Sequence, residues 1–106
     1  MLRLHYLYRD DAEQLTYGNF DFCNPEQLGV KQAMSMLEPL LIGEVFFIPN
    51  RVGLPALDSV DREEDDDYHE VESLESLELE TAEGPSFHEF IEKLRRFKQQ
   101  HPEEYW

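Results

Sequence analysis

The segment 61-DREEDDDYHEVE-72 places eight acidic side chains among twelve residues. Carboxylates at this density can bind a divalent cation, attract a basic protein, or remain solvated as an ordinary charged loop. Acid–base catalysis requires one desolvated carboxyl beside an ionised neighbour, and an exposed run of acids meets neither condition. The segment therefore favours binding over catalysis.

The acidic run contains the ligand spacing of a calcium-binding loop. Such a loop takes oxygen ligands at positions 1, 3, 5, 7, 9 and 12 and is closed by a glutamate. Numbered from Asp61, these positions are Asp61, Glu63, Asp65, Asp67, His69 and Glu72. Position 6, where the sharp turn needs glycine, is Asp66, and the flanks do not predict two helices. A calcium site formed by the five acids of this set is our alternative to a solvated loop.

Histidine and cysteine are weaker candidates for chemistry. His69 lies beside Asp67 and Glu70, but adjacent strand residues point to opposite faces, so we interpret His69 as a surface residue. The one cysteine, Cys23, precedes an expected helix start, where the helix dipole can activate a thiol. Because Asp21 lies nearby and no Cys-x-x-Cys partner exists, we interpret Cys23 as a small buried residue in a reducing compartment.

The formal charge of −15 is concentrated in residues 58–83, which hold thirteen of the 24 acidic residues and one of the nine Lys and Arg residues. This charge repels nucleic acid and anionic membranes and accelerates encounter with a basic protein. The N-terminal MLRLHYLYRDD has no apolar signal region, and no later run approaches the length of a membrane span. We expect a cytoplasmic protein that binds neither nucleic acid nor membrane, with its oligomeric state left open.

The N-terminal half predicts two strands, a helix and a third strand. Alternating polarity marks a strand at 2–8, and β-forming residues mark 15–23 as its pairing partner. The sequence 24-NPEQ-27 combines an N-cap, a first-turn proline and an acid, so it predicts a helix start, and Pro39 ends or kinks this helix. The apolar run 44-EVFFI-48 predicts a short buried strand.

The C-terminal half predicts an acidic loop at about 58–68, a strand and a helix. We place the strand from Tyr68 onward with a bulge near 73-SLES-76, although its apolar spacing also fits a helix. Ser86 and Glu89 form a capping box at the start of the last helix. Its apolar stripe consists of Phe87, Phe90, Ile91, Leu94 and Phe97.

These elements predict one α+β domain over residues 1–106, with an antiparallel or mixed sheet of about four strands covered by two helices in the order ββαββα. On the exposed face of the last helix, Glu89 precedes Lys93 and Glu92 precedes Arg96 by four residues. This spacing predicts two ion pairs on a solvated face.

Composition and charge favour a non-enzymatic protein-binding or regulatory domain, of a size and charge similar to inhibitors and immunity proteins of bacterial toxins. We expect a basic protein as its partner. The expected binding surface consists of Asp65, Asp66, Asp67, Tyr68, Glu70 and Glu72. Tyr68 is the expected anchor, and an inward orientation of this side chain is an equal alternative.

A module that binds calcium or another divalent cation is the second hypothesis. An enzyme without sequence signature is the third, and acidity serving only solubility is the simplest.

Titration with calcium and magnesium tests the second hypothesis. Because the loop lacks the glycine of a calcium loop, we expect no stoichiometric micromolar binding by chelator-treated protein in titration calorimetry. A micromolar site that Glu72→Gln abolishes would establish the cation-binding module instead.

Overall fold

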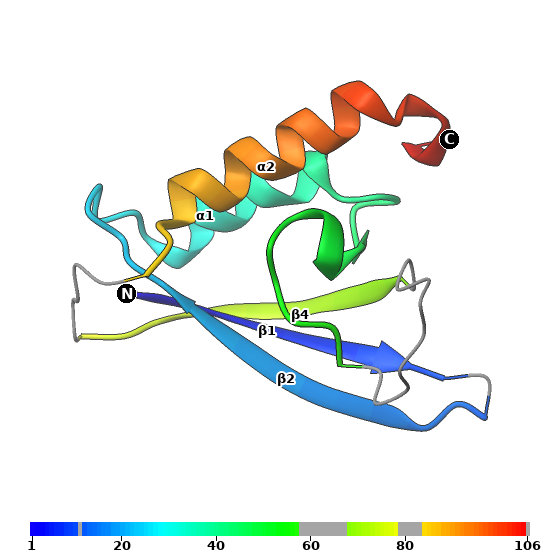
Figure 1. Ribbon diagram of the computed structural model, residues 1–106. Helices are drawn as coiled ribbons and strands as arrows, with labels where there is room; N and C mark the ends of the chain where they lie inside the picture. The colour runs from blue at the N-terminus through cyan, green and yellow to red at the C-terminus, as the bar shows by residue number, and fades with distance from the viewer. Residues whose placement is uncertain (11, 58–67, 79–83, 106) are drawn as a thin grey trace.

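The computed structural model describes residues 1–10, 12–57, 68–78 and 84–105, which form an antiparallel sheet with two helices over one of its faces (Figure 1). The strand order is β2–β1–β4–β3. The strands and helices are β1 (Leu2–Arg9), β2 (Leu15–Phe22), α1 (Val30–Leu37), β3 (Phe46–Phe47), β4 (His69–Ser76) and α2 (Phe87–Gln100). The predicted α+β class, with an antiparallel or mixed sheet of about four strands and two helices, is confirmed in these coarse terms, and the sheet is antiparallel.

β1 lies in the interior of the sheet, between β2 and β4. Its alternating pattern places Leu2 and Leu4 in the core, where neither is exposed to solvent. The register with β2 is uninterrupted along both strands. Asp10 closes this hairpin, because its Oδ1 atom accepts hydrogen bonds of 2.9 Å from the backbone N–H groups of Ala12 and Gln14. The predicted first strand and its pairing partner are therefore confirmed.

β4 pairs with the other side of β1 through a β-bulge. The register shifts between two neighbouring pairs, His5↔Ser73 and Tyr6↔Val71. Glu72 is therefore the extra residue, one position before the predicted bulge segment 73–76. The bulge changes the phase of the strand, so that Leu74 is buried although it breaks the alternation of the preceding residues.

α1 begins at Val30, so the helix start predicted at 24–27 is wrong. Asn24 does bind the backbone, but it closes a turn: its Oδ1 accepts from the N–H of Leu28 at 3.1 Å and its Nδ2 donates to the Leu28 carbonyl at 2.9 Å. Gln27 has a φ of 54°, which is incompatible with a right-handed helix at that point. The capping signal therefore belongs to a turn that precedes the helix.

The other predicted helix ends are confirmed. α1 ends at Leu37 and continues into a 3-10 turn that contains Pro39. Ser86 is the N-cap of α2, and its hydroxyl accepts a hydrogen bond of 3.1 Å from the N–H of Glu89. In the described parts of the chain, no helix is long and apolar enough to cross a membrane.

α2 packs its aromatic face onto the sheet. The ring of Phe90 stacks on Phe22 of β2, with centroids 4.8 Å apart, and meets the edge of Phe47 of β3 at 6.4 Å. The buried residues of α2 are Phe87, Phe90, Ile91, Leu94 and Phe97. They are the residues of the predicted stripe, so its place in the core is confirmed.

The segment 54–57 crosses the same face of the sheet (Figure 1). Leu54 is buried, and the Pro55 carbonyl accepts a hydrogen bond of 2.7 Å from the hydroxyl of Tyr6. At the end of this segment, Leu57 lies against Gly18 of β2. A Cβ atom on residue 18 would come within 2.5 Å of a Leu57 methyl group. The segment 54–57 is thus packed on the core.

The opposite face of the sheet carries charged side chains. The hydrogen bond from the Arg3 guanidinium to Asp21 lowers the pKa of that carboxyl below its usual value. Ion pairs on this face join Arg3 to Asp21 and Arg9 to Glu70, and the Nε2 atom of His5 lies 2.9 Å from a Glu75 carboxylate oxygen. These exposed pairs add little stability, so the domain depends on the aromatic core.

We expect Phe90→Ala to lower the free energy of unfolding by about 3–5 kcal/mol, because the ring is 2% exposed and a cavity would replace it. Urea unfolding monitored by circular dichroism measures this loss. Tyr17→Ala is the matched control, since that ring is 61% exposed and its removal should change stability by less than about 1 kcal/mol. Similar losses in both variants would contradict the role of α2 in the core.

Candidate functional site

The acidic site predicted from sequence lies mostly outside the described residues. Those outside are Asp61, Glu63, Asp65, Asp66 and Asp67. Their roles in recognition or calcium binding stay predictions. Described members are Tyr68, Glu70 and Glu72. Among the described residues, no three His, Cys, Asp or Glu side chains are grouped in a way that could hold a metal ion.

His69 is a core residue, so its interpretation as a surface histidine is wrong. Its exposed fraction is 1%, and its Nε2 atom accepts a hydrogen bond of 3.0 Å from the backbone N–H of Leu57. A backbone N–H only donates, so Nε2 carries no proton and the imidazole is neutral with its proton on Nδ1. The pairing of His69 with Phe47 turns both side chains inward. His69 therefore holds the segment 54–57 against the sheet.

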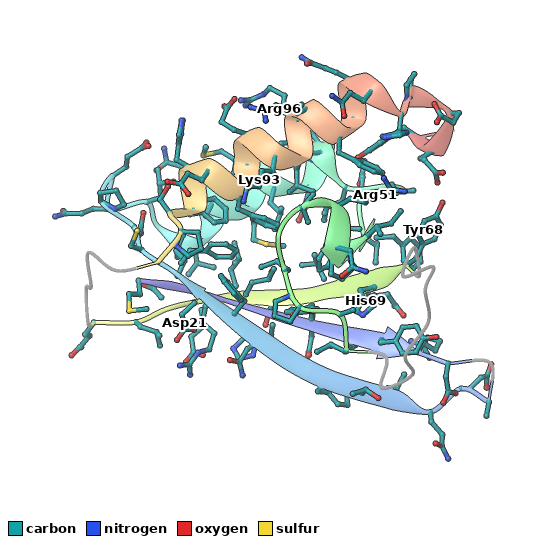
Figure 2. The ribbon with its side chains drawn as sticks, viewed as in Figure 1. Asp21, Arg51, Tyr68, His69, Lys93 and Arg96 are labelled. Carbon is teal, nitrogen blue, oxygen red and sulfur yellow. The ribbon has the colours of Figure 1, made fainter. Side chains whose placement is uncertain are left out.

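Tyr68 points outward and belongs to an exposed apolar cluster. Tyr68 is 44% exposed, Val45 is 38% exposed and Phe46 is 36% exposed, and the two rings lie 6.1 Å apart. We call these three residues the aromatic edge. The outward orientation of Tyr68 distinguishes it from its buried neighbour His69 (Figure 2).

A tight turn positions the aromatic edge. Gly43 and Glu44 have φ values of 60° and 65°, and the turn joins Ile42 to Phe46 by two backbone hydrogen bonds of 2.8 and 2.9 Å. The turn shortens the predicted strand 44–48 to Phe46–Phe47. Because neighbouring strand residues face opposite sides, Phe47 enters the core while Phe46 stays at the surface.

Acidic side chains surround the aromatic edge. Glu44 is exposed in the turn, and Glu70, opposite Phe46 in the sheet, pairs with Arg9 at 3.0 Å. The Tyr68 hydroxyl donates to the Glu104 carboxylate, which raises the pKa of the phenol above its usual value. The phenol is thus protonated at neutral pH and acts as a hydrogen-bond donor.

Cys23 connects β2 to the start of α2. Its backbone N–H donates to the Pro85 carbonyl at 3.1 Å, and its carbonyl accepts from the N–H of Phe87 at 3.0 Å. The side chain is half-buried, and its Sγ atom lies 3.5 Å from the Pro85 carbonyl oxygen. Since α1 begins only at Val30, the expected position of Cys23 at a helix start is wrong. Its contacts indicate a structural role.

The structure also contains a basic pocket that the sequence analysis did not identify. The pocket has a volume of about 180 Å³ and joins α2 to the 3-10 turn that contains Arg51 (Figure 2). Its lining residues are Arg51, Lys93, Arg96, Phe97, Gln100 and His101. In the sequence, the feature that indicates this pocket is the stretch 93-KLRRFK-98, which has four basic residues among six.

The ion pairs predicted on α2 do not form. Glu92 pairs with Arg95 instead of Arg96. Lys93 does not pair with Glu89, and its Nζ atom lies over Gly53, 2.9 Å from where a Cβ atom would be. Within the described part of the chain, Lys93 and Arg96 make no hydrogen bond or ion pair. Both cations therefore remain available to the pocket.

No family model matches this chain, and neither a curated protein nor a solved structure matches it. Function must be inferred from the chemistry of the aromatic edge and the basic pocket.

The role of His69 can be tested by removing its acceptor atom. His69→Phe preserves an aromatic ring but leaves the Leu57 N–H without its partner, so we expect a loss of about 1–3 kcal/mol in unfolding free energy. Urea unfolding is the measurement. His5→Phe is the control, because it removes only an exposed pair with Glu75 and should cost less than about 1 kcal/mol. A smaller loss for His69→Phe than for the control would contradict this role.

Proposed function

We propose that this protein is a non-enzymatic binding domain that recognises a basic protein through the aromatic edge and the acids around it. The observation that carries the proposal is the exposure of Phe46 and Tyr68 as a pair of rings at one edge of the sheet. Glu44 and Glu104 supply negative charge beside them.

Aromatic rings and carboxylates together suit an arginine- or lysine-rich surface. A guanidinium or ammonium group is attracted to the face of an aromatic ring, and the neighbouring carboxylates can accept its hydrogen bonds. Tyrosine gives a large contact area at a low entropic cost, so it is a common anchor of protein interfaces. The aromatic edge would supply affinity, while the acids would supply attraction at a distance.

The acidic residues 58–67 directly precede Tyr68 in the chain. Their charge would steer a basic partner toward the edge and accelerate association, an effect that falls steeply as ionic strength rises. An inhibitor or immunity protein requires recognition of this kind. This part of the proposal rests on the sequence, because residues 58–67 lie outside the described residues.

The chemistry of the edge supports binding over catalysis. Glu70 is neutralised by Arg9. Tyr68 has a raised pKa and keeps its proton, so it is a poor nucleophile or base. Glu44 is exposed to solvent, which leaves it without the desolvation that a catalytic carboxyl needs.

The proposal is tested with immobilised protein in lysate of the native cells at low and high salt. We expect the wild type to retain a basic protein that Phe46→Ala/Tyr68→Ala fails to retain. With the purified partner, the aromatic variant should mainly raise the dissociation rate, and Asp65→Lys/Asp67→Lys should mainly lower the association rate.

Tyr17→Ala on β2 is the matched control, because it removes an exposed ring at the opposite edge of the sheet. It should retain the partner as the wild type does. Retention by the Phe46/Tyr68 variant, or loss only in the Tyr17 variant, would rule out the aromatic edge as the binding surface.

A further inference from the structure

The two edges of the sheet differ in how open they are to another strand. β3, at one edge, is only two residues long, and the part of β4 that β3 does not pair with carries exposed acids at Glu72 and Glu75. Short strands and charged side chains protect a sheet edge from further pairing. β2, at the other edge, has eight residues, pairs with β1 without a bulge and contains neither proline nor lysine (Figure 1). The side formed by β2 is thus the open one.

The outer backbone groups of β2 are available for pairing. Every second residue of an edge strand points its N–H and carbonyl groups away from the sheet. Among the described residues, only those of β1 form backbone hydrogen bonds with Leu15–Phe22. Beyond the strand, the N–H and carbonyl of Cys23 bond to Pro85 and Phe87. We call the outer side of Leu15–Phe22 the β2 edge. The backbone of an added strand matches such a row of groups.

The β2 edge is nearly neutral, although the protein has a formal charge of −15. Asp21 is its one charged residue, and the Arg3 guanidinium donates to that carboxylate at 2.7 Å. A basic strand would find no unpaired carboxylate on β2, whereas a neutral strand would meet no repulsion there. The edge therefore fits a neutral strand of β-forming residues, and β2 itself is such a strand.

We propose that the β2 edge binds the β2 edge of a second copy of this chain, antiparallel about a two-fold axis. Such an interface is isologous, because each contact between the two copies occurs twice. Residues directly opposite each other lie on the same face of the joined sheet, so their positions differ by an even number. A pair centred on Gly18 meets this condition and uses residues 15–21 of both copies.

The pairing about Gly18 brings compatible side chains together. Thr16 lies opposite Phe20 of the second copy, and aromatic rings pair favourably with β-branched side chains across strands. Asp21 lies opposite Leu15 of the second copy, so the two Asp21 carboxylates are six residues, or about 20 Å, apart along the seam. Exposed charges act over roughly 8 Å at physiological ionic strength. Repulsion between these carboxylates is therefore small.

Dimerisation leaves the aromatic edge of each copy open. Because β2 and β3 lie at opposite ends of the strand order β2–β1–β4–β3, the joined sheet has β3 at both of its ends. The dimer would present two aromatic edges to basic partners. This consequence rests on the proposed function, whereas dimerisation itself does not.

Sedimentation equilibrium of the purified protein tests the dimer. We expect a reversible dimer whose dissociation constant falls as salt is raised, because screening weakens the repulsion between two acidic copies. Binding of a basic partner would respond to salt in the opposite direction. A wild type that stays monomeric at millimolar concentration, or a dimer that dissociates on addition of salt, would overturn the proposal.

Variants of opposite charge test the edge and its register. In Tyr17→Glu/Asn19→Glu, each new carboxylate lies opposite another, so the dissociation constant should rise at least about tenfold. Tyr17→Lys/Asn19→Lys should weaken the dimer in the same way. An equimolar mixture of the two variants should form a heterodimer, because each ammonium group then lies opposite a carboxylate. Circular dichroism checks that these exposed substitutions preserve the fold. Failure of the mixture to associate would contradict pairing about Gly18.

Phe46→Glu/Tyr68→Glu is the matched control, because it adds the same two charges at exposed positions of the opposite edge. Its dimer dissociation constant should stay within about twofold of the wild-type value at physiological salt. Weakening equal to that of the Tyr17/Asn19 variant would exclude the β2 edge as the interface. The same control variant should lose the basic partner of the proposed function, so each proposal can fail without the other.

Discussion

The packing of Phe90 against Phe22 and Phe47 is the contact on which both surfaces depend. β3 is only two residues long, so its backbone pairing alone is a weak restraint. Burial of Phe47 holds it in the core, and the alternation of side chains then leaves Phe46 at the surface. The same contact fixes the rotation of α2, so Lys93 and Arg96 face away from the core. Packing of the aromatic rings in the core thus positions both the aromatic edge and the basic pocket.

The sequence predicts those elements whose signals are local. α2 has a complete apolar stripe and a capping serine, and β1 has an alternation that only Leu7 breaks, so both are found where they are expected. The start of α1 was wrong because an asparagine makes similar side-chain bonds in a helix cap and in a turn. The phase of β4 depends on its register with β1, which no window around Glu72 contains.

The functional surfaces were harder to predict, because they too depend on contacts between residues that are distant in the sequence. The outward position of Tyr68 was one of two expected orientations, but Phe46 was assigned to a buried strand because the turn at Gly43 and Glu44 was not recognised. The basic pocket is not predictable from the spacing of charges along α2. That spacing predicts ion pairs within the helix, but it contains no information about groups on other elements that the same side chains contact. Arg51 joins Lys93 only through the fold, since more than forty positions separate them in the chain.

The interior position of β1 has a consequence for the chain during its synthesis. One edge of β1 has no partner strand until β4 emerges, and the sixty positions from Arg9 to His69 take about 3–12 s at ~5–20 residues per second. An unpaired hydrophobic strand is a template for aggregation with other chains. The acid-rich segment 58–67 directly precedes β4 in the chain, so its charge would oppose such association between chains once it has emerged.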